Sequence, residues 1–318
     1  MPPNLYSSNN EFSGLAEVAE ELNRPFRPDL KVARRDIRID GLIVSSIVWD
    51  TPPPEVVFLH GGGQNAHTWD AVALALGRPA IAVDLPGHGH SSWRGDRDYG
   101  PDRNAQTVAD VLDQLAPAAQ VVVGMSLGGL TLIRLAAARP DLVARAIIVD
   151  ITPRDEGASG HMTQAERGAA ALILGPRRFA TRQAMVDDAI RVSPRRSAAS
   201  VERGVMHNSR QFPDGMWGWR YDEILRGRRS DGSTSATLWR DLDSMVMPTM
   251  LVIGEESHHV TDRQLSRFRG LKPDAQVRSV QGAGHAVQSD RPTELARLIS
   301  QFGWSREPPP KAVRDSLQ

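Results

Sequence analysis

Two stretches of the chain alternate short apolar strands with amphipathic helices, and this alternation restricts the chain to one class of fold. The first stretch covers residues 56–150, and the second begins at Thr249. Strands that alternate with helices form βαβ units, which build a mostly parallel twisted sheet with helices on both faces. Ligands of such sheets bind beyond the carboxyl ends of the strands. The predicted strands are 56–59, 80–83, 120–125, 144–149, 249–253 and 276–280, and the predicted helices are 71–76, 105–115, 127–138, 261–269 and 291–302.

The segments outside this alternation predict additions to the α/β core. Residues 11–23 have helical spacing of apolar residues, and residues 36–49 read as a β-hairpin that turns at Asp40-Gly41. Residues 151–247 are polar and Arg-rich, and they are too long for a connecting loop. We therefore predict an N-terminal extension with a short helix at 1–35, a core at 36–150 and 248–303, a helical cap at 151–247 with helical pieces at 163–174 and 181–191, and a flexible tail at 304–318.

Composition excludes several classes of function. The chain has no cysteine, so disulfides, Cys-ligated metals and a thiol nucleophile are impossible. Lys plus Arg number 38, as do Asp plus Glu, and no basic block occurs, which argues against nucleic acid or an anionic membrane as partner. The chain has neither a secretory leader pattern nor an apolar run long enough to span a membrane. We expect a soluble cytoplasmic protein.

The most informative motif is Gly124-Met125-Ser126-Leu127-Gly128, which stands between a Val-rich strand and an amphipathic helix. A Gly-x-Ser-x-Gly motif in this context forms a sharp turn that exposes the serine hydroxyl at the helix N-terminus. Negative charge that develops there is favoured by the helix dipole. The flanking glycines let the strand and the helix approach without Cβ collisions. Ser126 is the predicted nucleophile.

A serine hydroxyl becomes a good nucleophile only when a base removes its proton. His285 lies in Gln281-Gly282-Ala283-Gly284-His285, between the last predicted strand and the last predicted helix. A loop at that place can reach back over the sheet edge to Ser126. His285 is therefore the predicted base.

The other histidines have different interpretations. His60 follows a strand and is expected to brace the glycine loop after it, while His258 and His259 are expected to be exposed near the site. His88 and His90 form a His-x-His pair, but the further ligands of a metallo-hydrolase are missing nearby. We expect no metal and no organic cofactor.

The order of motifs resembles the α/β-hydrolase superfamily across roughly residues 36–303. The motifs are His60-Gly61-Gly62-Gly63, Asp84-Leu85-Pro86-Gly87-His88-Gly89-His90-Ser91, the serine turn and the late Gly-x-Gly-His. The resemblance implies an oxyanion hole made by the N–H after the nucleophile and one from the loop after the third strand. By position these are the N–H groups of Leu127 and Gly62. The motifs are specific for fold and nucleophile but not for substrate.

The catalytic acid departs from the common pattern of this superfamily. Most members place an Asp after the strand at 249–253, in a Gly-x-x-Asp context, and here that position is Ser257. Serine cannot supply the negative charge that stabilises an imidazolium. Asp150 ends the preceding predicted strand, as in a branch of esterases and thioesterases, and is the predicted acid. Glu255, Glu256 and Asp262 remain alternatives, and Asp150 has the alternative role of a turn cap.

An aromatic cluster in the predicted cap indicates the substrate wall. Trp217, Trp219 and Tyr221 lie within five residues of one another, where they either pack the cap onto the core or form an apolar pocket. The residues expected to contact substrate are Gly63, Trp69, Met125, Trp217 and Trp219.

These features predict a serine hydrolase that cleaves a carboxylic ester or thioester of a small acyl substrate, apolar or aromatic, through an acyl-enzyme. The same triad can also hydrolyse carbon–carbon bonds, lactones or amides, or transfer acyl groups. A non-catalytic ligand-binding module on this fold is the alternative from another class.

Overall fold

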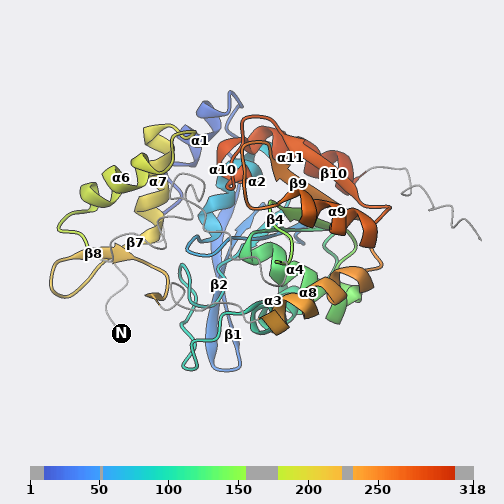
Figure 1. The fold of residues 1–318 in the computed structure, drawn as a ribbon. Coiled ribbons are helices and arrows are strands. Elements are labelled where there is room, and N and C mark those ends of the chain that lie inside the picture. The colour runs from blue at the N-terminus through green and yellow to red at the C-terminus, as the bar shows by residue number, and fades with distance from the viewer. Residues whose placement is uncertain (1–10, 51–52, 155–177, 224–231, 305–318) are drawn as a thin grey trace, which may run out of the picture.

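One eight-stranded sheet forms the centre of the protein (Figure 1). The structure, a computed structural model, describes residues 11–50, 53–154, 178–223 and 232–304. The strand order is β1-β2-β4-β3-β5-β6-β9-β10. β2 is antiparallel to both of its neighbours, and the other adjacent strands are parallel. The predicted α/β-hydrolase sheet is confirmed.

The elements follow the predicted alternation. The strands of the sheet are β1 (Val32–Ile39), β2 (Leu42–Trp49), β3 (Val56–Leu59), β4 (Ala80–Val83), β5 (Val121–Met125), β6 (Ala146–Val149), β9 (Thr249–Gly254) and β10 (Gln276–Val280). The helices around it are α1 (Leu15–Glu21), η1 (Ala66–Trp69), α2 (Asp70–Leu76), α3 (Pro101–Leu115), α4 (Leu127–Ala138), η2 (Pro140–Leu142), α8 (Gly232–Ser244), α9 (Asp262–Leu271), α10 (Val287–Asp290) and α11 (Pro292–Gly303).

Local chemistry explains several of these boundaries. The β1–β2 hairpin turns at Asp40 and Gly41, which both have positive φ, as tight two-residue hairpin turns require. This hairpin begins at Val32, earlier than the predicted start at 36. α3 begins at Pro101, because proline at the first helical position has a suitable φ and lacks only an N–H that would have no partner. α9 begins with a capping box between Thr261 and Gln264.

Two apolar layers enclose the sheet. α2 and α11 pack on one face, and α3, α4 and α8 pack on the other. The four residues of β3, from Val56 to Leu59, are all fully buried, because a parallel strand in the middle of such a sheet is covered on both faces. Because β3, β5, β6 and β9 are parallel neighbours, their carboxyl ends lie at the same edge of the sheet.

The chain between β6 and β9 carries four further described elements, which lie together beside the sheet (Figure 1). They are α6 (Arg182–Arg191), α7 (Ala198–Asn208), β7 (Ser209–Gln211) and β8 (Trp217–Trp219). The helix predicted at 181–191 is confirmed as α6, and the β7–β8 pair is a strand element that the helical prediction missed. The helix predicted at 163–174 and the tail from 305 lie outside the described residues.

None of the described helices is long and apolar enough to cross a membrane.

Candidate active site

Ser126 stands at the turn between β5 and α4, in a strained backbone conformation with φ 50° and ψ −114°. Its N–H donates to the Val149 carbonyl of the neighbouring strand at 3.2 Å, and its carbonyl accepts from Leu130 N–H at 3.0 Å. A Cβ at Gly124 would overlap the backbone of Gly128. The two glycines therefore allow the tight strand-to-helix packing that holds Ser126 in this conformation.

His285 lies in the loop after β10 and pairs with Asp150, which follows β6. The Nδ1 atom of His285 lies 2.8 Å from Oδ2 of Asp150, and both side chains are almost entirely buried. Gly284 N–H donates to the Asp290 carboxylate at 2.8 Å, which holds the loop that carries His285. A carboxylate on Nδ1 leaves Nε2 as the nitrogen for proton transfer.

Asp150 itself is held in an unusual backbone conformation, with a φ of 51°. Its N–H donates to the Val252 carbonyl at 2.7 Å, and its Oδ1 atom accepts from Gly254 N–H at 2.9 Å. Ser257 Oγ donates to Oδ2, the same oxygen that faces His285. Because β6 and β9 are paired neighbours, the loop after β9 reaches the carboxylate that follows β6.

Two of the alternative acids have other partners. Glu255 Oε2 accepts from Gly282 N–H at 3.1 Å. Glu256 Oε2 forms an ion pair with Arg195, at 2.5 Å from its Nη2. Among the acids considered, Asp150 is the one whose carboxylate contacts His285 within the described residues.

His259 stacks on His285, with ring centroids 3.4 Å apart and planes 7° from parallel. Burial and the positive charge of a protonated His285 lower the pKa of His259 to about 3, so its ring is neutral at physiological pH. His259 is not the exposed histidine that the sequence suggested. Asp150, His259 and His285 also lie close enough together to share a metal ion.

The loop Gly61–Asn65 after β3 holds the predicted oxyanion donor. Within the described residues, neither Gly62 N–H nor Leu127 N–H has a hydrogen-bond acceptor, and both residues line the same cavity as Ser126. His60 braces this loop as predicted: its Nδ1 lies 2.8 Å from the Gly61 carbonyl, and its Nε2 accepts from Leu85 N–H at 2.9 Å. Burial lowers the pKa of His60.

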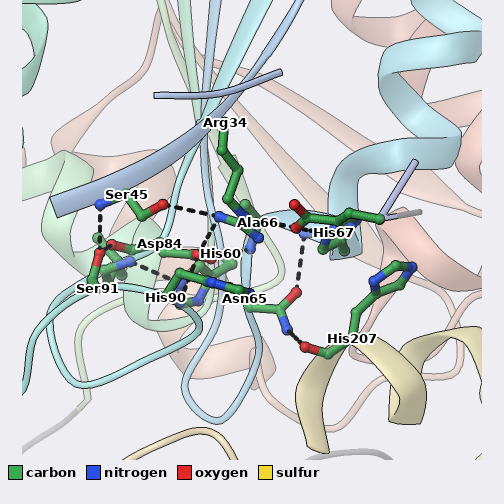
Figure 2. Close-up of polar contacts among 12 residues, drawn as sticks. Arg34, Ser45, His60, Asn65, Ala66, His67, Asp84, His90, Ser91 and His207 are labelled. Carbon is green, nitrogen blue, oxygen red and sulfur yellow. Dashed lines mark hydrogen bonds and ion pairs between the residues drawn. The ribbon is translucent and has the colours of Figure 1, made fainter. Parts of the chain in front are cut away.

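The end of α7 is joined to this same loop by two amide side chains. Asn208 Nδ2 donates to the Gly63 carbonyl at 2.7 Å. Asn65 Nδ2 donates to the His207 carbonyl at 3.1 Å (Figure 2). The loop after β3 therefore depends on the segment between β6 and β9 for part of its support.

Asp84, at the end of β4, is the centre of a buried polar network on the other side of this loop (Figure 2). Its carboxylate accepts from Ala66 N–H at 2.6 Å, from His90 N–H at 2.9 Å and from Arg34 Nη1 at 2.9 Å. Burial alone would raise the pKa of Asp84, but Arg34 and the other donors hold it at about 2. The ionised carboxylate fixes the start of η1 and the turn that contains His90.

His67 in η1 joins three parts of the chain. Its Nδ1 lies 2.8 Å from Asp70 Oδ2, and its Nε2 lies 2.9 Å from Glu11 Oε1. Burial acts to lower the pKa of His67, but the two carboxylates raise it to about 9, so the ring is an imidazolium. The ring of His207 from α7 stacks on it at 3.6 Å (Figure 2). His67, Asp70 and His207 form a second group with metal-ligand spacing, although carboxylates already occupy both nitrogens of His67.

A cavity of about 1040 Å³ contains Ser126 and His285 on its wall. Gly63, Met125 and Trp219, three of the residues predicted to contact substrate, line this cavity. Part of its lining is apolar and includes side chains from α1, α4, α7 and β8, namely Leu15, Val18, Leu130, Val201, Val205 and Trp219.

Two predicted substrate contacts lie elsewhere, outside the wall that the described residues form. Trp69 is fully buried below β3, where its ring stacks on Phe58 at 4.8 Å, because the apolar side of η1 packs on the sheet. Trp217 lies two residues before Trp219 on β8, a step of about 7 Å along a strand. There the guanidinium of Arg182 covers its ring at 5.0 Å.

Residues 56–298 match the family described as "Alpha/beta hydrolase family". The chain belongs to this family. It is 46% identical over 299 residues to the esterase Rv0045c of Mycobacterium tuberculosis, across 91% of this chain and 94% of that protein. A solved structure of that esterase has a TM-score of 0.78 and covers 91% of this chain and 97% of its own.

More distant relatives extend the comparison. The sn-1-specific diacylglycerol lipase ABHD11 of Mus musculus is 28% identical over 271 residues, which are 84% of this chain and 86% of that protein. A thioesterase domain from the curacin biosynthetic pathway shares the fold, with a TM-score of 0.72 and 23% identity across 85% of this chain and 99% of its own. The α/β-hydrolase resemblance predicted from the motifs is confirmed, and the comparisons support a hydrolase enzyme.

The sequence missed several residues at this α/β-hydrolase site. Glu11 and α1 precede the matched family region, and no motif connects them to the cavity that they line. His67 and His207 lie far apart in the sequence and meet only through folding. For His259, which stacks on His285, the sequence offered one indication, the tandem pair His258-His259 after a predicted strand.

Proposed function

We propose that this α/β-hydrolase is a serine hydrolase that cleaves a carboxylic ester or thioester through an acyl-enzyme intermediate. The observation that carries the proposal is the buried His285–Asp150 hydrogen bond at 2.8 Å beside the cavity that Ser126 also lines. A carboxylate, an imidazole and a serine hydroxyl in this order are the groups that acyl transfer needs. Ser126 lines that cavity and stands at a strained strand-to-helix turn, the kind of turn that exposes a nucleophilic serine hydroxyl.

In the proposed reaction, Ser126 Oγ attacks the substrate carbonyl while His285 Nε2 takes the hydroxyl proton. The tetrahedral intermediate then collapses, and His285 returns the proton to the departing alcohol or thiol. Water attacks the acyl-enzyme in the same manner, and the acid product leaves with Ser126 regenerated. Asp150 stays ionised throughout, orienting the ring through Nδ1 and stabilising its protonated form.

The N–H groups of Gly62 and Leu127 serve as the oxyanion hole in this proposal. Both are donors without an acceptor among the described residues, and Leu127 begins α4, whose dipole favours negative charge at its N-terminus. Removing one such donor from an enzyme of this kind costs about 3 kcal/mol of transition-state stabilisation.

The substrate is proposed to be a small acyl compound with an apolar acyl group. Aliphatic side chains from α1 and α7 line the cavity, and Met125 lies beside the serine. Pockets of this kind bind ligands through apolar contact and use a few polar groups for orientation. Relatives named as esterase and lipase support ester hydrolysis, and the thioesterase fold neighbour keeps thioesters among the substrates to test.

A fluorophosphonate probe tests the nucleophile directly. We expect covalent labelling of the wild-type protein and none of Ser126→Ala, with equal thermal stability of the two. A folded wild-type protein that fails to react would contradict the proposal. p-Nitrophenyl esters of increasing acyl length, compared with acyl-CoA thioesters, then separate the two bond types.

A further inference from the structure

Ser257 stands in Gly254-Glu255-Glu256-Ser257, at the position where the α/β-hydrolase resemblance leads one to expect an Asp. In the structure its hydroxyl donates to Oδ2 of Asp150, the oxygen that also accepts from His285 Nδ1 at 2.8 Å. Gly254 N–H donates to the other carboxylate oxygen at 2.9 Å. The last residue of β9 and the loop after it thus supply two of the three donors that converge on this fully buried carboxylate.

The hydroxyl of Ser257 makes two hydrogen bonds, one as donor and one as acceptor. Ser257 Oγ accepts from His259 N–H at 3.2 Å, and an ionised carboxylate can only accept. The single hydroxyl proton of Ser257 therefore points to Asp150. The same hydroxyl consequently ties the catalytic acid to the residue whose ring stacks on His285 at 3.4 Å.

We propose that Ser257 is a positioning residue that acts through Asp150 in the hydrolytic reaction. This inference rests on the proposed function, because it requires a reaction in which His285 becomes charged. Without the hydroxyl, Oδ2 of Asp150 keeps only the contact with His285 Nδ1, and Gly254 N–H is the other donor left to hold the carboxylate. The carboxylate is then less often oriented to stabilise the imidazolium of the transition state. Ser257 itself does not line the described cavity, so we expect the main effect of its loss on kcat rather than on KM.

The matched pair Ser257→Thr and Ser257→Val tests this role, since the two side chains have nearly the same shape and differ in the hydroxyl. We expect Ser257→Thr to keep kcat for a p-nitrophenyl ester within about threefold of wild type. Ser257→Val should lower kcat about tenfold with KM unchanged, as expected for loss of a hydrogen bond to a charged group. Thermal unfolding of both variants controls for the fold.

A double-mutant cycle tests whether Ser257 acts through Asp150. In the Asp150→Asn background, Ser257→Val should change the remaining activity less than twofold, because the charge that it orients is gone. An additive, tenfold loss in that background would overturn the inference, and so would equal kcat values for the Thr and Val variants.

Failure of this inference is separable from failure of the proposed function. Suppose that the wild-type protein reacts with fluorophosphonate and hydrolyses the ester while Ser257→Val keeps full kcat. The serine-hydrolase proposal is then supported, and the proposed role of Ser257 is wrong. If the wild-type protein does not react with the probe, both the proposed function and the role of Ser257 are wrong.

Discussion

The acid–base side of the candidate site and its oxyanion side are supported by different parts of the molecule. Asp150 and the loop of His285 are held by the end of β9, by the loop after it and by α10, through Gly254, Ser257 and Asp290. The loop Gly61–Asn65 is held in part by Asn208, which belongs to the segment inserted between β6 and β9. The contacts of the acid–base pair therefore come mainly from the end of β9, the loop after it and α10, while the loop Gly61–Asn65 takes a direct hydrogen bond from an addition to the core.

The N-terminal segment contacts the side of the site that contains the loop Gly61–Asn65. Glu11 contacts His67 next to the loop Gly61–Asn65, which we call the oxyanion loop. Glu21 of α1 forms an ion pair with Arg203 of α7 at 2.5 Å. These contacts join the N-terminal helix to α7 and to the core around one cavity. Changes in these additions are expected to alter the oxyanion loop and the substrate preference more than the acid–base pair.

The largest effect is expected on the acid–base side. Asp150→Asn should lower kcat by about 10³–10⁴-fold, because the amide cannot stabilise the imidazolium of His285. Steady-state hydrolysis of a p-nitrophenyl ester measures it. Glu255→Gln and Glu256→Gln are the controls, and a loss of this size in either of them would move the acid to the loop after β9.

The ion-pair junction at His67 predicts a pH-dependent stability. The folded pKa of about 9 lies above the ordinary 6.5, so the stabilisation is complete below pH 6.5 and is lost as pH rises through about 9. Its size is on the order of 2–3 kcal/mol. Urea unfolding at pH 7 and pH 10 should show a larger alkaline loss for wild type than for His67→Gln. Equal losses would show that the junction carries no such energy.

The tie between α7 and the oxyanion loop predicts a smaller catalytic effect. Asn208→Leu removes the donor to the Gly63 carbonyl and should lower kcat about tenfold with little change in KM. Gln211→Leu is the matched control, since Gln211 Nε2 donates to the Gly215 carbonyl within the same segment, at 3.0 Å. A similar loss in both variants would attribute the effect to the segment as a whole.

The smallest expected effect concerns α1. Val18→Phe adds volume to a buried residue on the cavity wall and should reduce the preference for long over short acyl esters about threefold in kcat/KM. Ala16→Trp places bulk on the exposed side of the same helix and should leave the preference unchanged. An unchanged profile for Val18→Phe would remove α1 from the substrate wall.

Local patterns were sufficient to predict much of the fold. The Val-rich runs at β5 and β6 and the helix stops after α4 identify the alternating core, because hydrophobic periodicity and backbone breakers act over a few residues. Trp69 shows the limit of such patterns. Its chemistry suits a substrate pocket as well as a core, and only the packing of η1 on Phe58 decided for the core.

The sequence alone determined the fold class and predicted Ser126 as nucleophile and His285 as base, with Asp150 ahead of Glu255, Glu256 and Asp262 as the acid, because each of these residues follows a strand that its own neighbours define. The tertiary structure decided which carboxylate faces His285, what Ser257 does, and that Glu11, His67 and His207 meet. These are contacts between segments distant in the chain. Their geometry depends on strand pairing and on how the additions pack against the sheet, which short-range patterns do not contain.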